Sequence, residues 1–179
     1  MSVSTHLTPE PERRLWIIYD NIRFAAGMAD IKIGALTIFA AGQMAVIKYL
    51  FPSSTLSLAA IFLLGTEIFI GILAFSPFSE ISKRLQDVEP PAKKGRIEDL
   101  LTSANDIAKY SRSELILRLD HYLGGGISAT GYYEDITGLI VFNARIAVRK
   151  QRLFKSACVL AAMAQILLLA QIILDKFLL

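Results

Sequence analysis

The chain has 179 residues, of which 54% are hydrophobic and 20% are charged, a balance that favours a membrane protein. Its net charge of +3 suits contact with anionic lipid headgroups or a phosphate ligand, but it is too small to argue for nucleic-acid binding. The apolar residues collect in three blocks, each of which is a candidate membrane span.

The N-terminal segment is polar and leads into a long helical pattern. Residues 1–12 contain two prolines, and no short apolar region follows them, so no secretory signal is predicted. Thr8 is a candidate helix N-cap. From Leu15 the apolar residues recur at helical spacing, and between Arg13 and Leu50 the only residues that could break a helix are glycines. We expect one long helix whose first half lies in the cytoplasm and whose second half spans the membrane.

Three apolar blocks have the length of a membrane span. They cover residues 33–51, 56–78 and 157–174. At ~1.5 Å of rise per residue, a helix needs about 20 residues to cross a hydrocarbon core of ~30 Å. Helices in soluble cores rarely stay apolar on all sides for this length, so we predict three transmembrane helices. The alternative is a soluble bundle of very apolar helices.

The connections between the blocks are polar. Residues 52–55 form a turn, the proline at position 77 marks the end of the second block, and residues 89–95 form a proline-rich linker. Residues 97–110 fit either a helix or an extended chain. The middle region therefore begins as irregular chain.

Two further helices are predicted after this region. Ser111 and Glu114 have capping-box spacing and predict a helix through Leu123, which the glycines at 124–126 end. From about Thr130 a helical pattern runs without proline into the third block. This pattern predicts a second long helix, about half of it outside the membrane.

These elements predict an all-α membrane protein with three transmembrane helices, the first and last of which extend into a cytoplasmic helical domain. The predicted parts are a cytoplasmic N-terminal helix at 1–32, a hairpin of two spans at 33–78, a cytoplasmic helical region and candidate sensor at 79–156, and the third span at 157–179.

The basic residues predict the orientation. Of the 19 Lys and Arg residues, all but Lys48 and Lys176 lie before the first span or between the second and third. Because basic loops remain on the cytoplasmic side, we expect the N-terminus and middle region inside the cell and the C-terminus outside.

Four polar side chains lie deep in the spans: Gln43, Glu67, Gln165 and Gln171. An intramembrane carboxyl group must be protonated, paired or hydrated. These residues fit either a polar lining for ions or water in an oligomer, or hydrogen bonds that hold helices together.

Charged residues gather where the first and last long helices enter the membrane. Asp30 and Lys32 precede the first span. A basic cluster precedes the third span and comprises Arg145, Arg149, Lys150, Arg152 and Lys155. The two groups lie at similar depth if the helices are antiparallel neighbours. The cluster fits an ordinary cytoplasmic anchor, or else Asp30 pairs with one of its cations.

In the second interpretation, the remaining cations face an anionic ligand. We assign Arg145, Arg149, Lys150 and Arg152 to phosphate binding. Asp30, Lys32 and Asp135 are assigned to inter-helix ion pairs.

No enzyme or metal site is predicted. The chain has no Walker A, HExxH or GxSxG motif, and its two histidines, His6 and His121, are far apart in sequence. Cys158 is the single cysteine and cannot form an intrachain disulfide. We therefore expect a non-catalytic protein without a cofactor.

Short motifs in the chain resemble those of the Pycsar effector transmembrane family. The Ala-Asp-Ile-Lys segment at 29–32 resembles the signature that opens the family's first span. Residues 105–109 with the capping box at 111–114 resemble its middle segment. Asp135, Asn143 and the segment at 150–156 resemble its last signature.

The resemblance extends from about Leu15 to Leu174 and implies a role in bacterial antiphage defence. In this family a partner cyclase makes a cyclic pyrimidine mononucleotide during infection, and the membrane effector responds by impairing the inner membrane. The implied partners are the second messenger, the lipid bilayer and other copies of the chain, and no nucleic acid. The alternatives are a related effector that answers another signal and a non-catalytic accessory subunit of a membrane complex.

Overall fold

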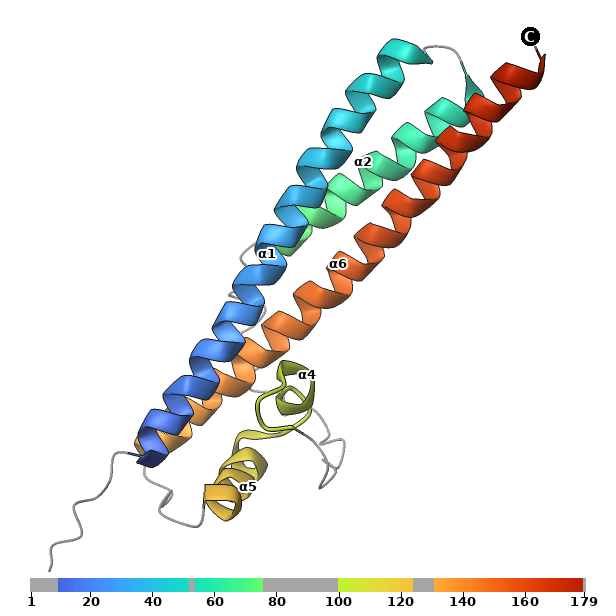
Figure 1. Cartoon of the computed structure of the whole chain (residues 1–179). Coiled ribbons are helices and arrows are strands. Elements are labelled where there is room, and N and C mark those ends of the chain that lie inside the picture. Colours follow the sequence, from blue (N-terminus) through green and yellow to red (C-terminus); the bar gives the residue numbers. More distant parts are fainter. Residues whose placement is uncertain (1–9, 52–53, 76–99, 124–130, 179) are drawn as a thin grey trace, which may run out of the picture. The chain divides into compact units, whose positions relative to one another are not determined.

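The computed structural model describes residues 10–51, 54–75, 100–123 and 131–178, whose regular secondary structure is entirely helical (Figure 1). The helices are α1 (Glu10–Leu50), α2 (Thr55–Phe75), α4 (Ala104–Ile107), α5 (Arg112–Leu123) and α6 (Gly131–Leu178). Of these, α1, α2 and α6 are long and apolar enough to cross a membrane. The predicted fold class, all-α with three transmembrane helices, is confirmed.

Both long helices extend as the sequence predicted. α1 has 41 residues and α6 has 48 residues. The segment at 97–110, which fitted either a helix or an extended chain, contains the short helix α4. The predicted N-cap at Thr8, the end of the second block, the linker at 89–95 and the glycines at 124–126 lie outside the described residues.

Contacts divide the chain into two compact units. Unit 1 comprises Met1–Gly27 and Phe78–Val148, and unit 2 comprises Met28–Pro77 and Arg149–Leu179. α1 and α6 each contribute their first part to unit 1 and their second part to unit 2. The unbroken backbone of these two helices therefore links the units.

Unit 1 has a core of aliphatic side chains from four helices. Leu15 of α1, Ile107 of α4, Leu119 of α5 and Ile140 of α6 are each no more than 1% exposed and belong to one cluster. Full burial of such a side chain stabilises the fold by roughly 1.5–3 kcal/mol. This shared core explains why α4, which is too short to be stable alone, is ordered.

A capping box begins α5, as predicted. The Glu114 backbone N–H donates to Ser111 Oγ at 3.2 Å, and the Ser111 backbone N–H donates to Glu114 Oε2 at 3.1 Å. Two backbone donors that the helix cannot satisfy are thereby paired.

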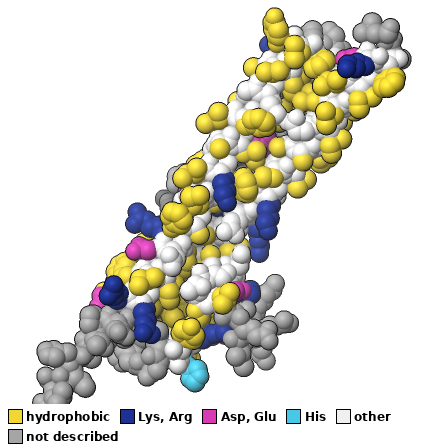
Figure 2. Space-filling view, viewed as in Figure 1, with side chains coloured by type: hydrophobic (Ala, Val, Ile, Leu, Met, Phe, Trp, Pro, Cys, Tyr) yellow, Lys and Arg dark blue, Asp and Glu magenta, His cyan; other side chains and the backbone are white. Residues whose placement is uncertain are grey.

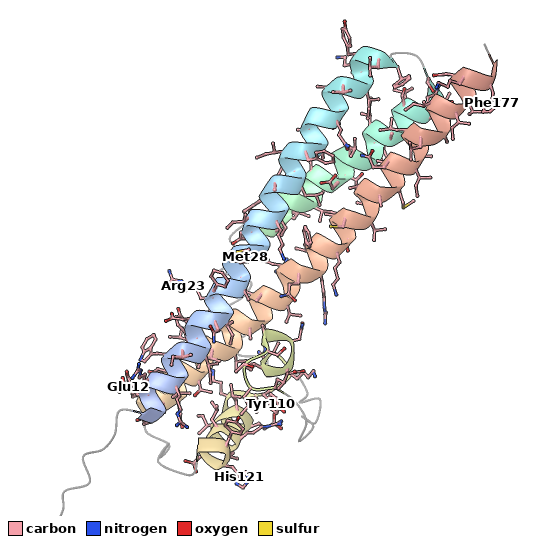
Figure 3. The ribbon with its side chains drawn as sticks, in the orientation of Figure 1. Glu12, Arg23, Met28, Tyr110, His121 and Phe177 are labelled. Carbon is pink, nitrogen blue, oxygen red and sulfur yellow. The ribbon has the colours of Figure 1, made fainter. Side chains whose placement is uncertain are left out.

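The first residues of α1 and α6 also meet within unit 1. The Tyr132 hydroxyl donates to Glu12 Oε1 at 2.5 Å, at the start of α1 (Figure 3). This hydrogen bond raises the pKa of the Tyr132 hydroxyl above its ordinary value, because it stabilises the protonated phenol. The contact fixes the register of the two helices in this unit.

Unit 2 packs α2 along the later parts of α1 and α6 (Figure 1). The buried residues of α2 are Ser57, Ala60, Leu64, Glu67, Gly71 and Ala74. They are separated alternately by three and four positions, which is the spacing of a coiled-coil seam. Facing helices contribute small buried residues such as Ala40 and Ala164, which allow transmembrane helices to approach closely.

α1 and α6 run parallel in each unit (Figure 1), so the antiparallel arrangement on which the similar depth of the two charged groups was made conditional is not found. Glu12 meets Tyr132 in unit 1, and Asp30 meets Lys150 in unit 2, each pair 120 residues apart in sequence. Two helices that enter the membrane from the same side must run in the same direction. The prediction of similar depth for Asp30 and the basic cluster did not need the antiparallel assumption.

Large apolar side chains cover much of the outer surface of unit 2. Large hydrophobic side chains such as Ile38, Phe62 and Leu169 are more than half exposed. Figure 2 shows hydrophobic side chains spread over the visible face of α1, α2 and α6 in this unit. Exposed apolar side chains around a helical core, with backbone hydrogen bonds satisfied inside each helix, suit a lipid environment.

Candidate functional site

An ion pair joins α1 to α6 in unit 2. Lys150 Nζ lies 2.6 Å from Asp30 Oδ2, and the two side chains are 21% and 33% exposed. Asp30 belongs to the segment at 29–32, and Lys150 begins the segment at 150–156, both of which carry the family resemblance. The structure thus brings two short motifs from opposite parts of the chain into direct contact.

Asp30 has hydrogen-bonding capacity that the ion pair does not use. Its Oδ1 atom is buried and has no hydrogen-bond partner among the described residues. Lys32, two positions later, is exposed, and so is Asp135 in unit 1. Neither has an ion-pair partner in the part of the chain that the structure describes. Of the three residues assigned to ion pairs, the structure places only Asp30 in one.

Arg145, assigned from sequence to phosphate binding, interacts with the backbone in unit 1. Its Nη2 donates to the Tyr110 carbonyl oxygen at 3.2 Å, and its Nε donates to the Ala108 carbonyl oxygen at 3.5 Å. These carbonyls follow α4, and Tyr110 lies where the chain passes from α4 to α5 (Figure 3). The guanidinium group therefore ties the α4 segment to α6.

The other assigned cations lie on the part of α6 that belongs to unit 2. Arg149 and Arg152 are exposed, as is Lys155. Their spacing of three residues places them on one broad face of the helix. Together with Lys150, they form a band of positive charge at the start of the predicted third span.

Replacing Arg145 with methionine is expected to destabilise unit 1 by about 1–3 kcal/mol, because two partly buried carbonyl groups lose a charged donor. Protease cleavage within residues 100–123, followed by mass spectrometry, measures this effect. The matched control is Arg23→Met on α1 of the same unit, since Arg23 is exposed and has no polar partner among the described residues (Figure 3). Equal protection of both variants from the protease would contradict the role of Arg145 in holding the α4 segment to α6.

Three of the four intramembrane polar residues have unsatisfied buried atoms. Glu67 is 1% exposed, and neither of its carboxyl oxygens has a hydrogen-bond partner within the described ranges. Gln43 Oε1 on α1 and Gln165 Nε2 on α6 are also buried without one. Leaving a buried polar group unpaired costs about 1–3 kcal/mol. The unpaired groups therefore mark three positions where packing has not been optimised for stability alone.

Gln171 differs from these three residues because both polar atoms of its side chain have a hydrogen-bond partner. Its Oε1 accepts a hydrogen bond from Ser54 Oγ, and its Nε2 donates to Asp175 Oδ1 at 2.7 Å. Ser57 Oγ also bonds to the carbonyl oxygens of Phe51 and Ser54 at 2.8 and 2.7 Å. Gln171 thus holds α6 against the α1–α2 connection.

Sequence reasoning missed two residues of this region, Ser54 and Gly71. The serine lies in a turn, where its type is common, and only its contact with Gln171 shows its role. Gly71 lies directly against Thr37 of α1. A glycine in an apolar helix is a weak signal, but its place in the seven-residue pattern could have identified it.

Comparison with known proteins yields one match. No curated protein and no solved structure matched the chain. The family model described as the Pycsar effector protein domain matches residues 14–175. This range includes all three candidate membrane helices apart from their outermost residues, and it includes both partners of the Asp30–Lys150 ion pair. The chain belongs to the Pycsar effector protein domain family.

Proposed function

We propose that this protein is a membrane effector of bacterial antiphage defence that is activated by a cyclic nucleotide and then impairs the inner membrane. Family membership and the three apolar helices support this proposal. The observation that carries it is the continuity of α1 and α6, each of which belongs to both units without a break. A change of packing in unit 1 can reach unit 2 through such helices.

The proposed location is the inner membrane, with the N-terminus and the middle region in the cytoplasm. The distribution of basic residues supports this orientation, because nearly all of them lie before the first span or between the second and third spans. A nucleotide made in the cytoplasm then has direct access to unit 1 and to the basic start of the third span. The proposed role is non-catalytic: binding energy alone shifts the helices.

The proposed ligand is a cyclic pyrimidine mononucleotide whose phosphate binds Arg149, Lys150 and Arg152. Arg and Lys suit phosphate oxygens. Lys150 pairs with Asp30 at 2.6 Å, so a phosphate at Lys150 competes with Asp30 for the same ammonium group. A ligand shifts an equilibrium only by binding one state better than the other. Competition for Lys150 supplies that difference, because it weakens a contact of the resting state.

We further propose that the active form is a homo-oligomer. The apolar outer surface of unit 2 suits contact with lipid and equally with a second copy of the chain. Crosslinking in native membranes with and without nucleotide measures this step.

Membrane potential reports the proposed activity. When the protein is purified into lipid vesicles that hold a potassium diffusion potential, adding a cyclic pyrimidine mononucleotide is expected to collapse the potential. Cyclic purine mononucleotides and the uncyclised monophosphate serve as controls. An unchanged potential, in vesicles where protease accessibility shows that unit 1 faces the added nucleotide, would contradict the proposed function.

A further inference from the structure

The carboxyl group of Glu67 has no counter-charge in residues 33–47 of α1, in residues 157–174 of α6 or elsewhere in α2. Residues 33–47, 157–174 and the rest of α2 contain no Lys, Arg or His and no other Asp or Glu. Among the described residues, the thiol of Cys158 on α6 interacts electrostatically with Glu67. No side chain of these segments can therefore neutralise a Glu67 carboxylate.

Glu67 also lies far from either end of its helix. It is about 18 Å from the start of α2 and about 12 Å from its end, at ~1.5 Å per residue. Its side chain is 1% exposed, and both carboxyl oxygens are buried without a hydrogen-bond partner among the described residues. A carboxyl group in such surroundings stays neutral by holding its proton.

Within the membrane-spanning segments, each of the three helices of unit 2 has one side chain with a buried polar atom that lacks a hydrogen-bond partner among the described residues. Besides Glu67 on α2, these are Gln43 on α1, through its Oε1 acceptor, and Gln165 on α6, through its Nε2 donor. A metal cation would need several oxygen ligands and would be repelled by an amide N–H donor. Water both donates and accepts, so it suits this combination of groups.

We propose that Glu67 is a proton-binding site within the membrane, through which water and protons enter the bilayer interior when the effector is active. In the resting state, the carboxylic acid is protonated and dry. When α2 loosens from α1 and α6, water reaches the carboxyl group and takes its proton as hydronium, which leaves a carboxylate. Gln43 and Gln165 hydrogen-bond the entering water. The proton site rests on the geometry alone, whereas its opening rests on the proposed function.

Infrared spectroscopy of the full-length protein in vesicles, without nucleotide, tests the proton site. Protonated carboxylic acids absorb at a higher carbonyl frequency than carboxylates. Subtracting the Glu67→Gln spectrum from that of the native protein is expected to leave a protonated-acid band at neutral pH. The matched control, Asp175→Asn on α6, removes a carboxyl group that accepts a hydrogen bond from Gln171 Nε2, and it is expected to leave the acid band in place. A carboxylate band for Glu67, or loss of its acid band when sodium chloride is added, would overturn the proposal.

Proton flux tests the opening step. The vesicles contain a pH-sensitive dye and hold a proton gradient across their membrane. Nucleotide is expected to dissipate this gradient in vesicles with native protein but not in vesicles with Glu67→Gln, while both proteins bind nucleotide equally. Glu67→Asp, which keeps the carboxyl group, is expected to restore part of the flux. Equal flux in native protein and Glu67→Gln would overturn the opening step. If native vesicles do not respond at all, the proposed function fails, and the infrared result still decides whether Glu67 holds a proton.

Discussion

Replacing Gly71 with alanine is expected to destabilise unit 2 by about 1–3 kcal/mol, the usual cost of overpacking a tight interface. An added Cβ at this position would collide with Thr37 Oγ1 on α1. Thr37 is β-branched, and its hydroxyl already donates to the Ile33 carbonyl at 2.9 Å, so it cannot move aside without losing that bond. Thermal unfolding in detergent, followed by helical circular dichroism, measures the effect.

Gly65 provides a matched control on the same helix. A Cβ added there would meet nothing within 4 Å, so Gly65→Ala is expected to be neutral or to stabilise α2 by up to about 1 kcal/mol through helix propensity. Combining Gly71→Ala with Thr37→Ala removes the colliding oxygen and is expected to recover most of the lost stability. Equal melting temperatures for Gly65→Ala and Gly71→Ala would show that α1 and α2 do not pack at Gly71 as described.

The variants Asp30→Asn and Lys150→Met are expected to change nucleotide sensitivity in opposite directions. Both remove the ion pair, which is partly exposed and contributes about 1–2 kcal/mol, between the values for surface and buried pairs. Asp30→Asn leaves Lys150 available to phosphate, so the nucleotide concentration for half-maximal response should fall about tenfold, which corresponds to ~1.4 kcal/mol. Lys150→Met removes a phosphate ligand, so that concentration should rise. Vesicle depolarisation against nucleotide concentration measures both changes.

A purely structural ion pair gives a different result. The two variants would then shift the response in the same direction, because each would weaken only the contact between α1 and α6. The reversed pair, Asp30→Lys with Lys150→Asp, adds a second criterion. It is expected to restore thermal stability without restoring the nucleotide response, since the ammonium group would then lie on α1 and not on α6 with Arg149 and Arg152.

The spans and the two long helices could be predicted from sequence because they depend on local composition. An apolar stretch of about 20 residues crosses a bilayer whatever packs beside it. The capping box at Ser111 and Glu114 is likewise local, since its donors and acceptors lie three residues apart. The short helix α4 could not be assigned, because four residues do not form a stable helix until Ile107 packs into the core of unit 1.

The candidate site depended much more on tertiary structure. Sequence placed Asp30 and a basic cluster at the same depth, but which cation meets Asp30 depends on the rotation of each helix about its axis. That rotation is set by side-chain packing over the whole helix, and it turns Lys150 toward Asp30 and Arg145 toward the carbonyls of Ala108 and Tyr110.

Composition alone established that Glu67 lies in the middle of a membrane span, but it could not show whether the side chain faces lipid or protein. A span that is apolar on every side carries no amphipathic signal to distinguish its faces. Only the packing of small residues such as Ala60 and Gly71 against the neighbouring helices turns that face of α2 inward and buries the carboxyl group. The sequence by itself thus determined which segments enter the membrane, because insertion into lipid depends on the average polarity of a segment. The tertiary structure decided which polar atoms meet, because those contacts depend on how the helices pack.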